Sequence, residues 1–157
     1  MHFYRLTGKT VDVKLNAARG GIAMAAKEKQ RIRALFVSNE KKRFANLEAV
    51  FSESKAAVTL AESGRQALAS MAGQFYDLVV ADETLPDMTG LQLAEKAMLK
   101  HPMSNFAVVS ALSHEDFHEA SEGLGILMQL KPNPDRETAK QLLDHLKNIL
   151  TLMGRAL

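Results

Sequence analysis

Short apolar runs alternate with amphipathic segments along most of the chain, from Ile32 to Met153. Each run is only a few residues long, is rich in Val, Leu, Ala and Phe, and is bounded by polar or turn-forming residues. Runs of this kind are typical of buried β-strands. The pattern predicts five strands: Arg33–Val37, Ala56–Leu60, Asp77–Ala81, Phe106–Val109 and Ile126–Leu130.

Between these runs, apolar residues recur every three or four positions, which indicates helices with one buried side. The predicted helices are Lys41–Ser52, Ser63–Ala72, Leu91–Lys100, Ser113–Gly123 and Arg136–Met153. The fourth has only Phe117 and Ala120 as its main apolar contacts, so we expect it to be the most weakly anchored.

Strands and helices that alternate at this spacing fit right-handed crossover connections in a parallel sheet. The sequence therefore predicts an α/β fold, a doubly wound (βα)5 parallel sheet of the flavodoxin-like type with strand order 2-1-3-4-5. In such sheets, ligands and chemistry lie at the carboxyl ends of the strands. The converging ends carry Ser38-Asn39-Glu40, Asp82, Ser110 and Lys131.

Charge is distributed unevenly between the two ends of the chain. Residues 1–33 hold eight Lys/Arg and two Asp/Glu, a net charge of +6, which leaves twelve basic and sixteen acidic residues, a net charge of −4, in residues 34–157. A basic leader could contact nucleic acid or an acidic surface, yet this one has no aromatics beyond Phe3 and Tyr4. We therefore predict a basic N-terminal extension over residues 1–30, a domain over residues 31–157, and no direct binding of nucleic acid.

Several classes of protein are excluded by what the sequence lacks. The chain has no cysteine, so it has no disulfide framework and no thiol chemistry. It has no apolar stretch long enough to span a bilayer and no apolar centre of a secretory signal, so we expect a cytoplasmic protein. No strand is followed by a Gly-rich phosphate loop, which argues against a nucleotide enzyme.

Asp82 is the candidate functional residue, because the segment Tyr76–Gly90, YDLVVADETLPDMTG, delivers it from a central strand onto a loop. An acid at such a position can equally end a strand or cap the next helix, so the interpretation depends on the other strand ends. Those ends read ALFVSNE, AVVSA and LKP. Together with DLVVADETLPDMTG, they resemble the receiver domain of two-component response regulators, over about Ile32–Met153.

The resemblance implies a role for each matching residue. Asp82 would accept a phosphoryl group from the phosphohistidine of a sensor histidine kinase or phosphotransfer protein. Ser110 would donate its hydroxyl to a phosphoryl oxygen, and the ammonium of Lys131 would pair with the phosphate. Such chemistry needs positioning and positive charge around the phosphoryl oxygens. Ala111 and Met128 would lie where the family transmits its conformational switch.

One departure from the family concerns the metal. Receiver domains present two acids to Mg²⁺ at the end of the first strand, where this chain has Ser38-Asn39. Because Mg²⁺ prefers carboxylate oxygens, we expect weak or absent binding by Asp82, Asn39 and the backbone carbonyl of Thr84. Glu40 and Glu83 could contribute a carboxylate, although Glu40 also suits the first turn of the following helix.

Two further expectations follow from these departures. Without the acid pair, the ammonium of Lys131 could pair persistently with Asp82 and hold the domain in one conformation. Met128 stands three residues before that lysine, where family members often have a Tyr or Phe. A thioether can repack but has no ring that swings between two positions, so the usual aromatic switch is not available.

Three hypotheses for function remain open. The first is a phosphorelay receiver with Asp82 as the phosphoacceptor and weakened dependence on magnesium, and the second is a phosphorylation-independent pseudo-receiver that acts as a protein-interaction module. In either case we expect contact with a target protein or a second copy through the fourth helix, fifth strand and fifth helix, and no membrane partner. The third, an enzyme of the same architecture, is disfavoured because the set of Asp82, Ser110 and Lys131 lacks a cofactor loop and a second general acid or base. The histidines lie on predicted helices or at their ends and need no catalytic role; they are His101, His114, His118 and His145.

Overall fold

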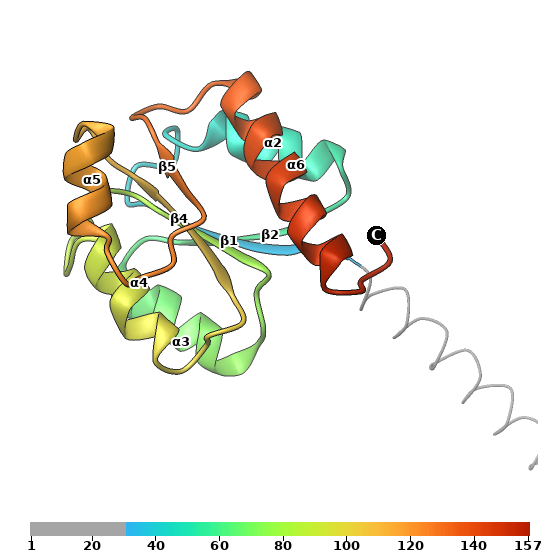
Figure 1. The fold of residues 1–157 in the computed structure, drawn as a ribbon, viewed down its shortest axis with the longest axis horizontal. Helices are drawn as coiled ribbons and strands as arrows, with labels where there is room; N and C mark the ends of the chain where they lie inside the picture. The colour runs from blue at the N-terminus through green and yellow to red at the C-terminus, as the bar shows by residue number, and fades with distance from the viewer. Residues whose placement is uncertain (1–30) are drawn as a thin grey trace, which may run out of the picture. The chain divides into compact units, whose positions relative to one another are not determined.

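A computed structural model of the chain describes residues 31–157, so the basic extension predicted over residues 1–30 lies outside the described residues. The described part forms a five-stranded sheet in which all neighbouring strands are parallel, in the order β2-β1-β3-β4-β5 (Figure 1). The strands are β1 (Arg33–Val37), β2 (Ala57–Ala61), β3 (Leu78–Ala81), β4 (Asn105–Val109) and β5 (Met128–Leu130). The predicted fold class and strand order are confirmed.

Five helices follow the strands in turn: α2 (Ala45–Glu53), α3 (Gly64–Gly73), α4 (Gly90–Met98), α5 (His114–Ala120) and α6 (Arg136–Leu152). Helices α2 and α6 cover one face of the sheet, and α3 and α4 cover the other. Along the central strands, alternate residues point to opposite faces. Thus Phe36 packs under α2 and α6, whereas its neighbours Leu35 and Val37 pack under α3 and α4.

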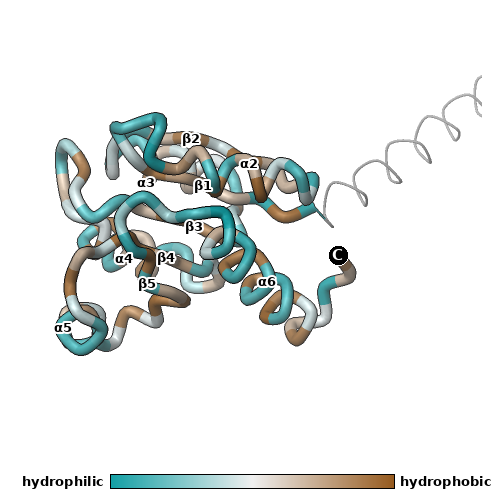
Figure 2. Tube along the Cα trace, turned by 90° about the horizontal axis from the view of Figure 1, so that it is seen from above, coloured by the Kyte–Doolittle hydropathy of each residue, from teal (hydrophilic) through white to brown (hydrophobic). Residues whose placement is uncertain are grey.

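Helix α6 shows why its sequence predicts a buried side. Its hydrophobic and hydrophilic residues alternate along the trace in Figure 2. The buried residues recur at helical spacing, and they are Ala139, Leu142, Leu143, Leu146 and Leu150. Asp135 begins the helix, because its side chain accepts a hydrogen bond from the backbone N–H of Thr138 at 2.7 Å. That contact lowers the pKa of the Asp135 carboxyl below its ordinary value.

The register of the sheet brings the strand ends to one edge. Val37, the last residue of β1, pairs with Ala81, the last residue of β3. Ala81 pairs in turn with Val108, and Val109 pairs with Leu130 at the end of β5. The residues that follow these positions, Ser38, Asp82, Ser110 and Lys131, therefore lie along the same edge, as the predicted topology requires.

Every helix differs from its predicted bounds by at least one residue at one end, and the largest differences are at α2 and α5. Helix α2 begins at Ala45 rather than Lys41, because residues 41–44 form turns. Helix α5 is short, and of its two expected apolar anchors only Phe117 is buried whereas Ala120 is exposed. No helix within residues 31–157 combines the length and apolar character needed to cross a membrane.

Candidate functional site

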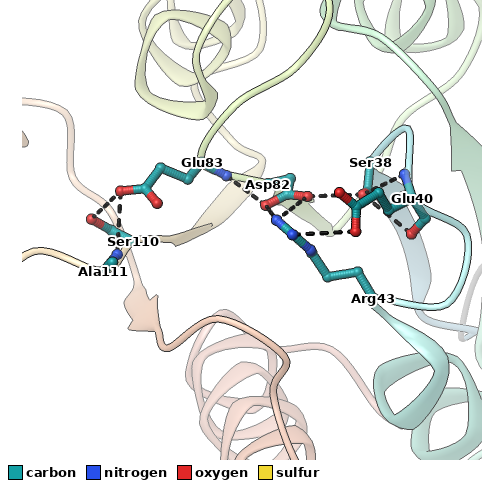
Figure 3. Close-up of polar contacts among 7 residues, drawn as sticks. All are labelled: Ser38, Glu40, Arg43, Asp82, Glu83, Ser110 and Ala111. Carbon is teal, nitrogen blue, oxygen red and sulfur yellow. Dashed lines mark hydrogen bonds and ion pairs between the residues drawn. The ribbon is translucent and has the colours of Figure 1, made fainter.

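Asp82 directly follows β3 and is buried, with 1% of its surface exposed. Its Oδ1 accepts hydrogen bonds from Arg43 Nη1 and from the backbone N–H of Glu83, both at 2.9 Å. Its Oδ2 accepts hydrogen bonds from Ser38 Oγ at 2.9 Å and from Arg43 Nη1 at 3.0 Å. Figure 3 shows this carboxylate enclosed by its donors. A buried carboxylate needs such partners, because leaving its charge unpaired away from water is costly.

Arg43 reaches Asp82 from the turns between β1 and α2. Its backbone N–H donates to the carbonyl of Glu40 at 3.0 Å, and the N–H of Ala45 donates to Lys42 at 3.3 Å. These short-range bonds replace the first turn of the predicted helix, and the side chain of Arg43 extends toward the sheet edge (Figure 3). The sequence prediction missed this residue. Its only signal was the basic run Lys41-Lys42-Arg43 after the first strand.

The electrostatics of Arg43 are set mainly by Asp82. The hydrogen-bonded carboxylate of Asp82 raises the pKa of Arg43 above its ordinary value, and Glu40 adds to the effect. Glu40 Oε2 lies 3.2 Å from Arg43 Nη2. The guanidinium is therefore a permanent positive charge between two acids. Its Nε is buried and has no hydrogen-bond partner among residues 31–157.

Glu40 does not begin a helix, because it precedes the turns that lead to α2. Its expected role in the first helical turn is therefore wrong, and its side chain pairs with Arg43 instead. Asn39, the other neutral residue at the end of β1, is exposed. Ser38 is buried and its hydroxyl serves two partners, since it donates to Asp82 and accepts from the N–H of Glu40 at 3.1 Å.

Ser110 directly follows β4 and is buried, but its hydroxyl is directed to Glu83 rather than to Asp82. Ser110 Oγ and the backbone N–H of Ala111 both donate to Oε1 of Glu83, each at 3.2 Å. The same hydroxyl accepts a hydrogen bond from the N–H of Leu112 at 3.2 Å. Glu83 thus extends away from Asp82 toward the β4–α5 segment, as Figure 3 shows.

Lys131 follows β5 and is exposed. Its Nζ donates to the backbone carbonyl of Leu112 at 3.3 Å. The ion pair expected between Lys131 and Asp82 is not formed, and the cation on Asp82 is Arg43. The ammonium of Lys131 is instead directed to the backbone of the β4–α5 segment, and the two oxygens of Asp82 are occupied by Arg43, Ser38 and the N–H of Glu83.

The loop after Asp82 is held in place by close packing. A Cβ on Gly90 would lie 2.4 Å from the backbone oxygen of Asp82, so only glycine fits this approach. Thr84 forms an isolated antiparallel bridge with Thr89 across the loop. The side chain of Asp87 extends from the loop to the start of α3, where it accepts hydrogen bonds from the N–H groups of Arg65 and Gly64 at 2.8 and 2.9 Å. Those two bonds lower the pKa of the Asp87 carboxyl below its ordinary value.

A groove of about 490 Å³ opens beside this edge, between α5, β5 and α6. Met128 lines it and also packs against the core under α2 and α6. The other lining residues are His114, Phe117, His118, Ser121, Ile126, Leu127, Gln129, Lys131 and His145.

A second buried acid lies at the opposite end of the sheet. Asp77 precedes β3, is 2% exposed and pairs with Arg155. Its other oxygen accepts the backbone N–H of Arg33 at 2.8 Å. This pair attaches the segment after α6 to the amino edge of the sheet, away from Asp82. The Asp77–Arg155 ion pair is structural in character. The sequence analysis placed Asp77 in the third strand and did not predict this pair.

The fold and site together define a class: a parallel α/β sheet with an acid at the carboxyl end of its central strand and polar groups at the neighbouring ends. The model of the response regulator receiver domain family matches residues 34–143. The chain therefore belongs to the response regulator receiver domains of two-component signalling. A search of curated proteins returns no significant match.

Solved structures support the same fold. The chemotaxis response regulator CheY4 of Vibrio cholerae superposes with a TM-score of 0.68 at 17% identity, over 74% of this chain and 98% of that one. The signal receiver domain of an HD domain-containing protein from Pseudomonas fluorescens Pf-5 gives 0.69 at 21% identity, over 81% and 95%. A CheY-like receiver domain protein from Methanospirillum hungatei JF-1 gives 0.66 at 22% identity, over 77% and 94%.

Receiver domains generally use Mg²⁺, so the donors around Asp82 can be tested against that ion. Mg²⁺ requires near-octahedral oxygen ligands and generally one or two carboxylates. Here the nearby carboxylates are committed elsewhere, Asp82 and Glu40 to Arg43 and Glu83 to Ser110. A guanidinium on the central carboxylate also repels a divalent cation, so these residues do not fit magnesium.

Proposed function

We propose that this receiver domain signals by protein contact without phosphorylation of Asp82. The observation that supports the proposal is the buried ion pair between Asp82 and Arg43, with Nη1 at 2.9 and 3.0 Å from the two carboxylate oxygens. The chain uses an internal cation where the family uses a metal. Its end of β1 carries Ser38 and Asn39 in place of the two acids that the resemblance leads one to expect.

The state of the Asp82 carboxylate argues against its acting as a nucleophile. Each oxygen accepts two hydrogen bonds, and one of the donors is a charged guanidinium. Charge-assisted hydrogen bonds are about twice as strong as neutral ones. An oxygen that attacks phosphorus must give up at least part of this stabilisation, so the barrier to phosphoryl transfer rises.

The partner surface under this proposal is the groove between α5, β5 and α6. It combines apolar side chains such as Phe117 and Met128 with the polar groups of Gln129 and Lys131, a mixture that suits a protein partner. That partner is a target protein or a second copy of the chain, and neither a membrane nor nucleic acid is required. Because the proposed signal is contact, the domain acts as no enzyme.

Incubation with acetyl phosphate and magnesium, followed by intact-mass measurement, tests the proposal. The chain is expected to gain no phosphoryl adduct even after prolonged incubation. Asp82→Asn serves as the matched control for labelling elsewhere on the chain. An adduct in the parent chain that disappears in the control would overturn the proposal.

A phosphoryl adduct that depends on Asp82 would support the second candidate function. This candidate is a phosphorelay receiver that takes a phosphoryl group on Asp82 from a histidine kinase. Two observations favour it. Asp82, Ser110 and Lys131 follow neighbouring strands at one edge, and Arg43 Nε is a buried donor without a partner within residues 31–157. A phosphoryl oxygen could accept from that donor, and Arg43 would then supply the positive charge that the transfer needs.

A further inference from the structure

Glu83 offers a carboxylate oxygen to two donors at the end of β4. The hydroxyl of Ser110 and the N–H of Ala111 converge on Oε1, each at 3.2 Å. Two donors on one oxygen form a small anion-binding arrangement. The oxygen that fills it belongs to the residue next to Asp82 in the chain.

A phosphoryl group on Asp82 would present the same chemistry, because it also offers negatively charged acceptor oxygens. Under the proposed function no such group is present, so the donors at Ser110 and Ala111 need another acceptor. Glu83 supplies one permanently. Its side chain is half-buried and its backbone begins directly at Asp82, so the contact is short and local.

The segment that Glu83 holds is connected to the groove. The backbone carbonyl of Leu112 accepts hydrogen bonds from Gln129 Nε2 at 2.9 Å and from Lys131 Nζ at 3.3 Å. Gln129 Nε2 also donates to the carbonyl of Ser110 at 3.3 Å. Both Gln129 and Lys131 line the groove between α5, β5 and α6. An unbroken series of contacts therefore runs from the carboxylate of Glu83 to the groove.

We propose that Glu83 is a positioning residue, a built-in anionic ligand that fixes residues 110–112 and thereby sets the shape of the groove without a phosphoryl group. This inference rests on the proposed function, since it identifies what replaces the phosphoryl oxygen. In this arrangement, the guanidinium of Arg43 neutralises Asp82, and the carboxylate of Glu83 holds the residues that follow β4.

Four variants of the full chain test the proposal by NMR at neutral pH without phosphodonor. Glu83→Ala removes the acceptor, and solvent exchange of the Ala111 N–H should accelerate at least about tenfold, as expected for the loss of a hydrogen bond to a charged group. Glu83→Gln keeps the size but not the charge and should give an intermediate rate. Glu83→Asp keeps the charge but is one methylene too short and should resemble Glu83→Ala. Glu95→Gln makes the same charge change at an exposed site of α4 and should behave as the parent chain.

The series also predicts where chemical shifts change. Glu83→Ala should move the amide resonances of residues 110–112 and 128–131, including the side-chain amide of Gln129. If exchange at Ala111 and these shifts match those of Glu95→Gln, the proposal is overturned. If Glu83→Ala loses the fold, Glu83→Gln decides by the same two readouts. Phosphoryl labelling of Asp82 would refute the proposed function alone, because exchange at Ala111 is measured on the unlabelled chain.

Discussion

Replacing Arg43 by alanine tests whether the buried ion pair stabilises the domain. Two unit charges 2.9 Å apart attract by about 6 kcal/mol at an effective dielectric constant of about 20. Desolvation of the pair offsets part of this attraction, yet removing one partner leaves a buried charge uncompensated, which typically costs about 3–5 kcal/mol. The side chain of Arg43 is 26% exposed, so water can reach the vacated space. We therefore expect Arg43→Ala to lower the free energy of unfolding by about 2–3 kcal/mol.

Urea denaturation followed by circular dichroism measures this change, and Arg136→Ala is the matched control. Arg136 pairs with Glu53 at 2.8 Å, but both side chains are largely exposed, so its loss should cost less than about 1 kcal/mol. Adding Asp82→Asn to Arg43→Ala should recover part of the lost stability, because it removes the unpaired charge. Equal losses in Arg43→Ala and Arg136→Ala, or no recovery in the double variant, would refute the reasoning.

Two other predictions concern the loop after Asp82 and the acids at the N-termini of α3 and α6. Gly90→Ala should destabilise the domain by about 1–3 kcal/mol, because the new Cβ would meet the backbone oxygen of Asp82 at 2.4 Å; Gly73→Ala, whose Cβ meets nothing within 4 Å, should not, and equal thermal midpoints would contradict this explanation. The lowered pKa values of Asp87 and Asp135 predict acid sensitivity. Because both carboxyls have depressed values in the folded state, their stabilisation is complete above the unfolded pKa of about 3.9 and is lost as the pH falls through the folded values. Asp135→Asn keeps a capping oxygen but cannot titrate. When the pH is lowered below about 4, its thermal unfolding midpoint should therefore fall less than that of the parent chain. Parallel plots of midpoint against pH for the two chains would exclude titration of Asp135 as a cause of acid sensitivity.

The fold could be predicted from the sequence because its signals are redundant. Strand β3 reads as a continuous apolar run, and all four of its residues are buried. Helix α6 carries a regular apolar side, and that side is the buried one. The prediction of helix bounds and burial was wrong where a segment has few apolar residues. Helix α5 buries only Phe117, so its boundaries and the exposure of Ala120 depended on neighbours that local periodicity does not reveal.

The site was predicted only as far as backbone position determines it. Asp82 and Ser110 lie at the expected edge because they directly follow strands. The contacts of long side chains could not be predicted in this way, because several partners lie within their reach and the backbone position does not determine which one they contact. Lys131 donates to a carbonyl beside β5, and Glu83 turns toward Ser110. Arg43 reaches Asp82 only because turns replace the first turn of α2, a detail that helical periodicity cannot predict.

These contacts change the balance between the two leading hypotheses. From the sequence, the phosphorelay receiver stood slightly ahead of the phosphorylation-independent module. Asp82 pairs with Arg43, and Ser110 donates to Glu83. Under the proposed function, these two contacts take the places of the metal and of the phosphoryl group. We therefore place the contact module first, and both remain forms of one receiver domain.

The most direct test is a crystal structure of the chain soaked in millimolar magnesium and beryllofluoride, a mimic of the phosphoryl group. We expect the guanidinium of Arg43 to stay on both oxygens of Asp82 and neither ion to bind there. Octahedral density between Asp82, Asn39 and the carbonyl of Thr84, with beryllofluoride on Asp82 and Arg43 displaced, would contradict it.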